Sequence, residues 1–387
     1  MTHRLPSALW TQRADLAALV AALGPERMRW VGGAVRDTLL GAPVKDIDAA
    51  TTLRPEEVIA ACHAAGLKTV PTGIEHGTVT VVLSGGPVEV TTLRQDVSTD
   101  GRHATVAFAQ DWREDAARRD FTINALYAHP VTLEIFDYFG GIDDLAERRV
   151  RFIGDARQRI REDHLRILRY FRFQARFGQT IDDPSEQACA DLAATLKGLS
   201  RERVGQEMMN LLALPDPAPT VARMARLGVL PVILPEADPA ALTALVAWEQ
   251  EQKVAPAALR RLAALIPADP ALAEQVASRF RLSGAQKKRL ACAARRMQGT
   301  PHALAYRLGV EEARDALLLD GQDARGLDGF TPPTFPLKGG QIVARGLAAG
   351  PQVARVLHMV EARWVEEGFP DEARVARLLD ETLAALP

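Results

Sequence analysis

The sequence predicts an α+β protein, with a mixed head up to about Asp137 and a long helical part after it. Two observations support this prediction. First, three segments rich in Val and Thr have the composition of strands: Val44–Ala50, Thr78–Leu83 and Val88–Leu93. Second, such segments almost disappear from Asp143 onward, where Ala, Leu, Arg and Glu recur at helical spacing. The chain therefore combines a head of strands and helices with an all-helical remainder.

The sequence predicts the order of strands and helices in the head. Arg29–Asp37 reads as a strand that runs through two glycines into a short helix, and a second strand then carries Asp46-Ile47-Asp48. A helix is expected to begin at Pro55, because proline suits a first helical turn, and to end near Gly66. The segment Ser84-Gly85-Gly86-Pro87 then connects the last two strands as a hairpin.

Length and composition indicate a globular protein of two to four domains. The chain has 387 residues, of which 47% are hydrophobic and 25% charged. The longest apolar stretch near its start, Leu16 to Leu23, predicts neither a signal peptide nor a membrane span. Three widely spaced cysteines fit free thiols in a reducing cytoplasm. The net charge of −2 argues against indiscriminate coating of nucleic acid but allows a local basic groove.

Asp46 and Asp48 form the first candidate site. Side chains two residues apart on a strand point to the same face, and two like charges so close are unfavourable without a cation between them. Carboxylates suit Mg²⁺, which takes one or two of them together with substrate phosphates. Gly32 and Gly33 precede a short helix and let backbone N–H groups approach a phosphate. Together these pieces predict a Mg²⁺-dependent nucleoside triphosphate site. Taken separately, Gly32-Gly33 is compatible with an ordinary turn, and Asp46-x-Asp48 with a solvated strand edge.

A second candidate segment, Asp115–Leu126, contains two arginines, an acid and an amide before an apolar run. Arg119 offers a charged fork to triphosphate oxygens, and Asn124 can hydrogen-bond a sugar hydroxyl. The alternative is a helix start in which Asp120 is the N-cap and the arginines are solvated. The segment Asp137–Leu145 reads as a turn into a helix, and a hinge between domains is the favoured interpretation.

The segment Phe139–Gly178 is strongly basic, with ten arginines against six acidic residues. Within it, Arg161–Phe173 reads as a helix. One face gathers Glu162, Arg166, Arg169, Arg172 and Arg176, and the opposite, buried face gathers Ile167, Leu168, Phe171 and Ala175. Asp163 and Arg166 offer an acceptor and a fork of donors, which can satisfy the edge of cytosine or adenine. The alternative is an amphipathic helix with ion pairs between successive turns.

Glu89, in the strand Val88–Leu93, is a candidate third carboxylate beside the aspartate pair. A cross-strand ion pair, or one with Arg94, explains the same residue equally well.

The order of these motifs resembles that of class II tRNA nucleotidyltransferases, the bacterial CCA-adding enzymes. These enzymes are related to bacterial poly(A) polymerases within the polymerase-β-like superfamily. The resemblance covers about residues 29–178 and is carried by Gly32-Gly33-x-Val35-Arg36-Asp37, Asp46-x-Asp48, Glu89-Val90-Thr91-Thr92-Leu93-Arg94, Arg118-Arg119-Asp120-Phe121-Thr122-x-Asn124-Ala125, Gly140-Gly141-x-x-Asp144-Leu145 and Glu162-Asp163-x-x-Arg166-x-x-Arg169-x-x-Arg172-Phe173.

The resemblance implies roles for these residues. Asp46 and Asp48 would bind the catalytic Mg²⁺. Gly33 and Arg36 would contact the incoming nucleotide, and Arg119 would contact its sugar-phosphate part. Asp163 and Arg166 would form the protein template that pairs with CTP or ATP, with Glu162 steadying Arg166. Arg169 and Arg172 would hold the triphosphate. The resemblance also implies a flexible loop at about Arg94–Val106. There this chain has Gly101-Arg102-His103-Ala104 where the family often has Gly-Arg-Arg-Pro.

The implied architecture is a polymerase-β-like nucleotidyltransferase head with a small mixed sheet at residues 1–138, then helical neck 139–205, body 206–310 and tail 311–387. The implied reaction is template-independent addition of CCA to the 3′ end of tRNA from CTP and ATP, with release of pyrophosphate. The tRNA acceptor arm would be the macromolecular partner, and no membrane is involved. A poly(A) polymerase and an enzyme adding only CC or only A share nearly all the motifs. A non-catalytic RNA-binding protein would not need Asp46 and Asp48.

Overall fold

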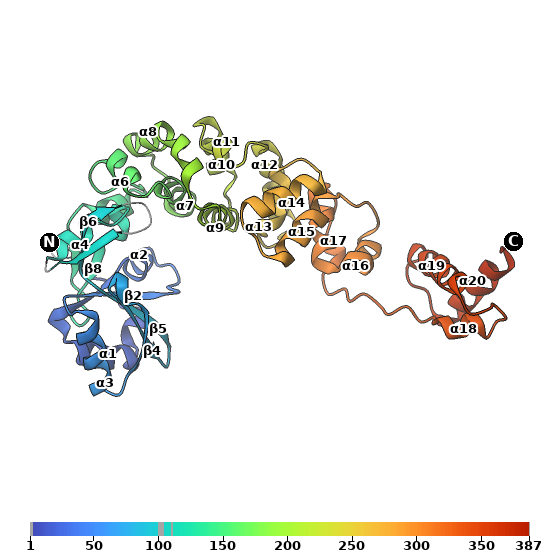
Figure 1. Ribbon diagram of the computed structural model, residues 1–387, viewed down its shortest axis with the longest axis horizontal. Helices are drawn as coiled ribbons and strands as arrows, with labels where there is room; N and C mark the ends of the chain where they lie inside the picture. The colour runs from blue at the N-terminus through green and yellow to red at the C-terminus, as the bar shows by residue number, and fades with distance from the viewer. Residues whose placement is uncertain (1–2, 100–103, 110, 387) are drawn as a thin grey trace. The chain divides into compact units, whose positions relative to one another are not determined.

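The computed structural model describes residues 3–99, 104–109 and 111–386. Contacts divide the chain into two compact units. The first comprises Met1–Glu207 and Arg223–Ile233, and the second Met208–Ala222 and Leu234–Pro387. Figure 1 shows the elements of both units. Among the described helices, none has the length and apolar content that crossing a bilayer requires.

The head is built on a seven-stranded sheet. Its strands lie in the order β3 (Lys68–Gly73), β4 (Thr78–Leu83), β5 (Gly86–Thr92), β2 (Ile47–Thr51), β1 (Met28–Val31), β8 (Leu126–Ala128) and β9 (Ile135–Asp137). β2 pairs in parallel with β5, and the other neighbouring strands of this sheet run antiparallel. The predicted small mixed sheet and its hairpin are therefore confirmed. β4 has the predicted bounds, whereas β2 begins at Ile47 and so later than predicted.

Helices cover this sheet and connect its strands. α1 (Ala14–Leu23) packs on α3 (Pro55–Ala64), which also contacts β3, β4 and β5, and α2 (Gly33–Leu39) packs on β1, β2 and β8 (Figure 1). α3 begins at Pro55, as predicted. A separate hairpin of β6 (Arg94–Thr99) and β7 (Ala104–Phe108) follows β5. Residues 101–103 of the predicted loop motif lie outside the described residues.

The turn after β9 is held tightly. The carboxylate of Asp137 accepts hydrogen bonds from the backbone N–H groups of Phe139, Gly141 and Ile142 at 2.9–3.1 Å. A Cβ atom at Gly141 would lie 2.3 Å from the carbonyl oxygen of Thr122, so no side chain fits there. The helix that begins at this glycine is α5 (Gly141–Ala146). The turn is thus a packed junction, and its role as a hinge stays a prediction.

The neck contains α6 (Ala156–Glu162), α7 (Arg166–Phe177) and α8 (Asp183–Asp191), followed by α9 (Arg201–Leu212). The prediction of one helix over residues 161–173 is wrong, because the chain is extended at Asp163 (φ −150°, ψ 104°). The Asp163 carboxylate accepts the N–H of Leu165 at 3.1 Å and so favours a turn over a continuous helix. Ile167, Leu168 and Phe171 are buried, as predicted for the apolar face of α7. Ala175 is half-buried.

The rest of the chain is helical, as predicted. Its helices are α10 (Ala218–Arg226), α11 (Leu230–Ile233), α12 (Pro239–Glu251), α13 (Ala258–Leu265), α14 (Pro270–Arg279), α15 (Gly284–Ala294), α16 (Pro301–Leu308), α17 (Val310–Leu319), α18 (Gly339–Val343), α19 (Pro351–Glu366) and α20 (Glu372–Ala384). The predicted boundaries after residues 205 and 310 fall inside α9 and at the first residue of α17. The division into head, neck, body and tail therefore stays a prediction.

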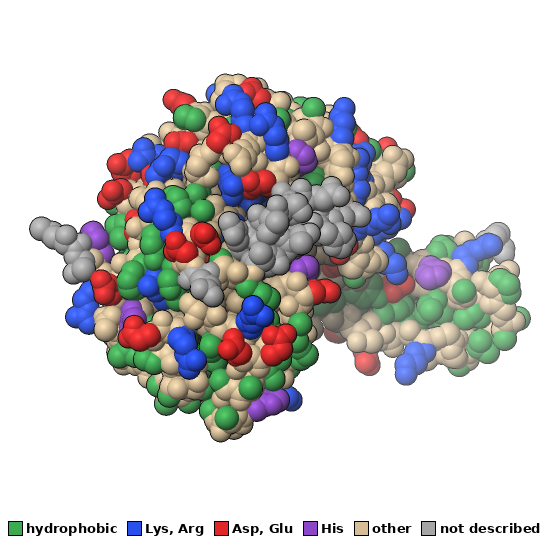
Figure 2. All heavy atoms as spheres, turned by 60° about the vertical axis from the view of Figure 1, so that its left-hand side comes forward, with side chains coloured by type: hydrophobic (Ala, Val, Ile, Leu, Met, Phe, Trp, Pro, Cys, Tyr) green, Lys and Arg blue, Asp and Glu red, His purple; other side chains and the backbone are tan. Residues whose placement is uncertain are grey.

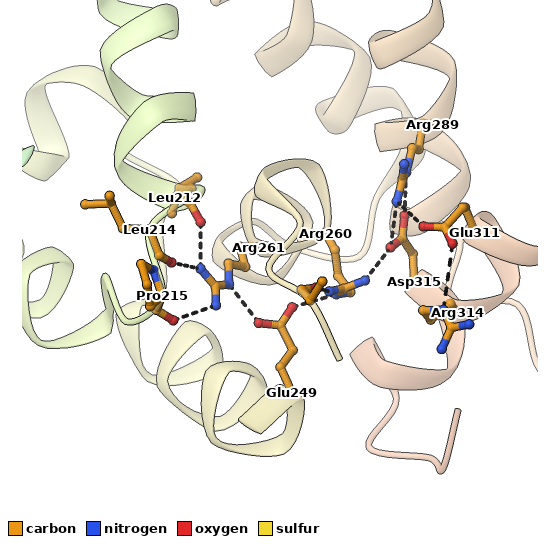
Figure 3. Close-up of polar contacts among 11 residues, drawn as sticks. Leu212, Leu214, Pro215, Glu249, Arg260, Arg261, Arg289, Glu311, Arg314 and Asp315 are labelled. Carbon is orange, nitrogen blue, oxygen red and sulfur yellow. Dashed lines mark hydrogen bonds and ion pairs between the residues drawn. The ribbon is translucent and has the colours of Figure 1, made fainter. Parts of the chain in front are cut away.

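A buried polar network joins helices of the second unit (Figure 3). Glu249 of α12 accepts hydrogen bonds from Arg260 at 2.6 Å and from Arg261 at 2.8 Å, and all three side chains are 1% exposed. Arg261 also donates to the carbonyls of Leu212, Leu214 and Pro215. At the other end, Arg260 donates to the buried Asp315, which also accepts from the less buried Arg289 of α15. These charges lie among helices and are satisfied by protein groups.

Candidate active site

The predicted site residues converge on one pocket of about 410 Å³ in the first unit. It is lined by Gly32, Gly33, Arg36, Asp48, Arg118, Arg119, Asp120, Asn124, Asp163, Arg166, Arg169 and Phe173. Four other predicted residues do not line it: Asp46, Glu89, Glu162 and Arg172. Strands and loops of the head and the first turns of α7 thus meet around a single cavity.

Of the three predicted metal-site carboxylates, Asp48 lines this pocket. Asp48 lies on β2 directly beside Glu89 of β5 in the parallel register, and Asp46 is exposed just before the strand. Residues paired in this way project from the same face of a sheet. Burial raises the pKa of Asp48 to about 6, with the charges of Glu89 and Asp46 adding to the rise and Arg119 opposing it. Asp46, Asp48 and Glu89 together therefore carry excess negative charge, which a bound cation would compensate.

This donor set fits a divalent ion that is completed by its substrate. Among the described residues, no group of three or more His, Cys, Asp or Glu side chains stands ready as a metal cluster. Mg²⁺ commonly uses only one or two carboxylates and takes its remaining ligands from water and substrate phosphates. Asp46 lies before β2 and not on the strand, where it was predicted, so the pairing of Asp46 with Asp48 as metal ligands stays a prediction.

Arg119 is held at the pocket by Asp115, a residue that the sequence analysis did not single out. The Asp115 carboxylate is 1% exposed and accepts hydrogen bonds from Arg118, Arg119 and the Tyr127 hydroxyl. Burial alone would raise the pKa of Asp115, but the charges of Arg119 and Arg118 and the Tyr127 hydrogen bond hold it well below its ordinary value. Asp115 therefore stays ionised and fixes both guanidinium groups.

Asp120 has a similar role on the other side of the pocket, and the interpretation of it as a helix N-cap is wrong. Its carboxylate accepts two hydrogen bonds from Arg169, at 2.6 and 2.9 Å, and one from the amide of Asn124 at 2.9 Å. Asn124 also accepts from Arg36, whose Nε donates to Asp37 at 2.8 Å. Asn124 is therefore bound on both sides by protein groups, and a sugar contact from it stays a prediction.

Asp163 and Arg166 lie together where α7 begins. Arg166 donates to the Glu162 carboxylate at 2.6 Å and to the carbonyl oxygens of Arg159 and Arg118 at 2.9 and 3.1 Å. These contacts place Glu162 where it steadies Arg166. Asp163 follows the last residue of α6 and Arg166 begins α7, so the interruption of the helix brings both an acceptor and a donor group to the pocket lining.

Arg172 lies outside the pocket lining. Its Nε donates to Glu207 of α9 at 2.6 Å, and Glu207 also lies 3.7 Å from Arg169. Arg203, also on α9, donates to Asp163 at 2.6 Å. Neither α9 residue belongs to a motif, so sequence reasoning had no signal for them beyond opposite charges one helical turn apart.

Comparisons with known proteins agree with this geometry. Two family models match: "Poly A polymerase head domain" at residues 28–151, and "Probable RNA and SrmB- binding site of polymerase A" at residues 178–241. The mitochondrial CCA tRNA nucleotidyltransferase 1 of Mus musculus is 33% identical over 374 residues, which cover 88% of this chain and 83% of the mouse protein. The chain belongs to the class II CCA tRNA nucleotidyltransferase family.

Two further family members show how far the likeness extends. The human mitochondrial CCA tRNA nucleotidyltransferase 1 is 46% identical over 192 residues, which are 48% of this chain but only 43% of the human protein. The matched segment thus spans less than half of that relative. The crystal structure of the Bacillus stearothermophilus CCA-adding enzyme in complex with CTP matches 96% of this chain and 99% of its own, with 25% identity and a TM-score of 0.75. Nucleotidyltransferases of this family generally use a divalent metal.

Proposed function

We propose that this protein adds CCA to the 3′ end of tRNA, taking the nucleotides from CTP and ATP without a nucleic-acid template and releasing pyrophosphate. The supporting observation is that one pocket combines a carboxylate centre at Asp48 with a base-reading pair, Asp163 and Arg166. A carboxylate centre alone serves many phosphoryl-transfer reactions. A fixed acceptor and a fixed donor beside it provide a means of choosing the base.

Asp46 and Asp48 would hold Mg²⁺, and Glu89 is proposed as a third carboxylate because it neighbours Asp48 in the sheet. When bound, Mg²⁺ stabilises negative charge on the attacking and leaving oxygens. The 3′-hydroxyl of tRNA attacks the α-phosphate of the nucleotide, so that a new phosphodiester bond forms and the bond to pyrophosphate breaks.

The other side chains bind and orient. Arg119 and Arg169 present charged donors to the triphosphate while Asp115 and Asp120 keep them in place. Gly32 and Gly33 allow the nucleotide to approach the backbone, and Arg36, which also lines the pocket, is proposed to contact the nucleotide. Arg172 is proposed to join the triphosphate contacts by exchanging its bond to Glu207 for a phosphate oxygen.

The helical remainder would bind the tRNA acceptor arm, mainly through its phosphates. On the face drawn in Figure 2, basic and acidic side chains are interspersed, in line with the net charge of −2. The three free cysteines fit a reducing compartment, and a cytoplasmic site of action is part of the proposal.

The test is incubation of the protein with tRNA that ends at the discriminator base, together with Mg²⁺ and CTP, ATP or both, followed by sequencing of the new 3′ ends. CCA is expected only when both nucleotides are present, and CC with CTP alone. A run of adenosines would instead identify a poly(A) polymerase, and termination after CC or addition of A only to tRNA ending in CC would identify a partial enzyme. Unchanged tRNA in every reaction would reject nucleotide addition altogether.

A further inference from the structure

Asp163 is held much less firmly than its partner Arg166. Arg166 has three acceptors from three residues of the neck and head. The backbone of Asp163 is hydrogen-bonded to Arg159 and Arg166, but its carboxylate lies in the extended break between α6 and α7, and its side chain is 27% exposed. Its one local bond, to the N–H of Leu165, engages Oδ1. Local structure alone therefore leaves the second oxygen without a fixed direction.

Arg203 supplies the missing constraint from a distant part of the chain. Its Nη2 donates to Oδ2 of Asp163 at 2.6 Å across 40 residues of sequence, from the first turn of α9. Arg203 itself does not line the pocket. One turn further along α9, Glu207 binds Arg172, so the same helix pairs with opposite charges on both sides of the base-reading segment. α9 thus acts as a support against which Asp163 is oriented.

The orientation of Asp163 has chemical consequences. A carboxylate only accepts hydrogen bonds, and its two oxygens offer about four lone-pair positions, of which Leu165 and Arg203 engage one each. Cytosine and adenine both present an exocyclic amino group on this edge, whereas uracil and guanine present a carbonyl oxygen there. A carboxylate held in place binds the amino group and repels the carbonyl oxygen. A carboxylate free to rotate loses most of that discrimination.

We propose that Arg203 is a positioning residue that sets nucleotide choice by fixing the acceptor edge of Asp163. This inference rests on the proposed function, and it adds to that function a residue that touches neither nucleotide nor metal. Two hydrogen bonds, from Leu165 and Arg203, hold the Asp163 carboxylate, and Asp163 lines the pocket.

The test compares Arg203→Gln with the unaltered protein for incorporation of CTP, ATP, UTP and GTP into tRNA, with kcat and KM measured separately. The preference for CTP and ATP over UTP and GTP is expected to fall about tenfold, because an acceptor that is no longer directed rejects the wrong base poorly. Arg203→Lys, which keeps a charged donor, should restore part of the preference. Arg201→Gln, at the first residue of the same helix, removes an equal charge and should leave the preference unchanged.

A double variant separates positioning from a general structural effect. In an Asp163→Ala background, Arg203→Gln should have no further effect on selectivity, because the group through which it acts is gone. An equal loss of all four activities on Arg203→Gln would overturn the proposal, and so would an undiminished loss of selectivity in the Asp163→Ala background. If Arg203→Gln lowers the melting temperature, the Arg203→Lys result decides. Failure of the unaltered protein to extend tRNA would reject the proposed function itself, which is a separate outcome.

Discussion

Arginines serve opposite purposes in the two units of this chain. In the pocket, Arg119 and Arg169 are 19% and 33% exposed and face the cavity, Arg119 paired with Asp115 and Arg169 with Asp120 and, at 3.7 Å, Glu207. In the helical network, Arg260 and Arg261 are 1% exposed and surrounded by Glu249, Asp315 and backbone carbonyls. The first arrangement leaves charge available to a ligand, and the second neutralises charge within the fold. An arginine that is paired but still partly exposed can bind a ligand, whereas a fully enclosed arginine stabilises the fold.

The largest effect is expected at Asp48, whose charge the neighbouring Arg119 partly offsets. Asp48→Asn should lower nucleotide addition by about a thousandfold, as loss of a group that stabilises transition-state charge does. Binding of tRNA should change little, because its affinity comes from phosphate contacts elsewhere. Single-turnover incorporation and a tRNA binding titration measure the two effects. Asp46→Asn serves as the matched variant, and turnover within tenfold of the unaltered protein would show that the metal site is misplaced.

The network of the second unit should show the reverse behaviour. Glu249→Gln removes the charge that neutralises Arg260 and Arg261 and should lower the free energy of unfolding by about 3–5 kcal/mol, because breaking a buried pair leaves an uncompensated charge. Urea denaturation measures this change. Below the unfolding transition, the relative use of CTP and ATP should be the same as in the unaltered protein. A change in the relative use of CTP and ATP without loss of stability would show that the buried network is not purely structural.

Substitutions of Arg169 and Arg172, two arginines of α7, should lower nucleotide binding to different extents. Arg169→Gln keeps a hydrogen-bonding group near Asp120 but removes a charge, and KM for CTP and for ATP should rise by about tenfold, to the same extent for both. Arg172→Gln should have a similar but smaller effect, because Arg172 is bound to Glu207 and does not line the pocket. Steady-state kinetics with each nucleotide provide the comparison. No effect from Arg172→Gln would mean that Arg172 stays bound to Glu207 when substrate binds.

The smallest effect on stability is expected at an ion pair that lies neither in the pocket nor in the buried network. Arg279 and Glu236 form a bidentate ion pair with side chains 27% and 21% exposed. Arg279→Gln should cost about 0.5 kcal/mol or less, as partly exposed pairs do. The hydrogen bond from Arg279 lowers the pKa of Glu236, so the contribution is present at neutral pH and is lost as the pH falls through that lowered pKa. Urea denaturation at neutral and acidic pH should show the difference between the two proteins disappearing in acid.

The same contrast explains how much the sequence could predict. β4 and the start of α3 followed from local composition and from Pro55, and the motif residues around Asp48 and Arg166 were close enough in sequence to be read together. Local spacing could not show that the chain breaks at Asp163, because a side-chain bond to Leu165 competes with the helix there. The ion pair between Arg203 and Asp163 spans 40 residues, so packing alone creates it.

The partners of the buried charges could not be predicted either. Arg260 and Arg261 stand in the apolar run Ala257–Ile266, where two adjacent charges are a visible anomaly. Their partner Glu249 lies on a different helix, and the acceptors on Leu212, Leu214 and Pro215 are backbone carbonyls that carry no sequence signature. Sequence can indicate that such charges need partners but cannot say where those partners lie.

The close contact at Gly141 has a consequence for how this protein can vary. A methyl group at position 141 would collide with the Thr122 carbonyl oxygen, and Thr122 begins the short turn that carries Asn124 into the pocket. Even an alanine at position 141 would therefore displace the turn Thr122–Asn124, and with it the Asn124 side chain that lines the pocket. In a random-mutagenesis screen for loss of nucleotide addition, position 141 should accept no other amino acid, although nothing at that position touches a substrate.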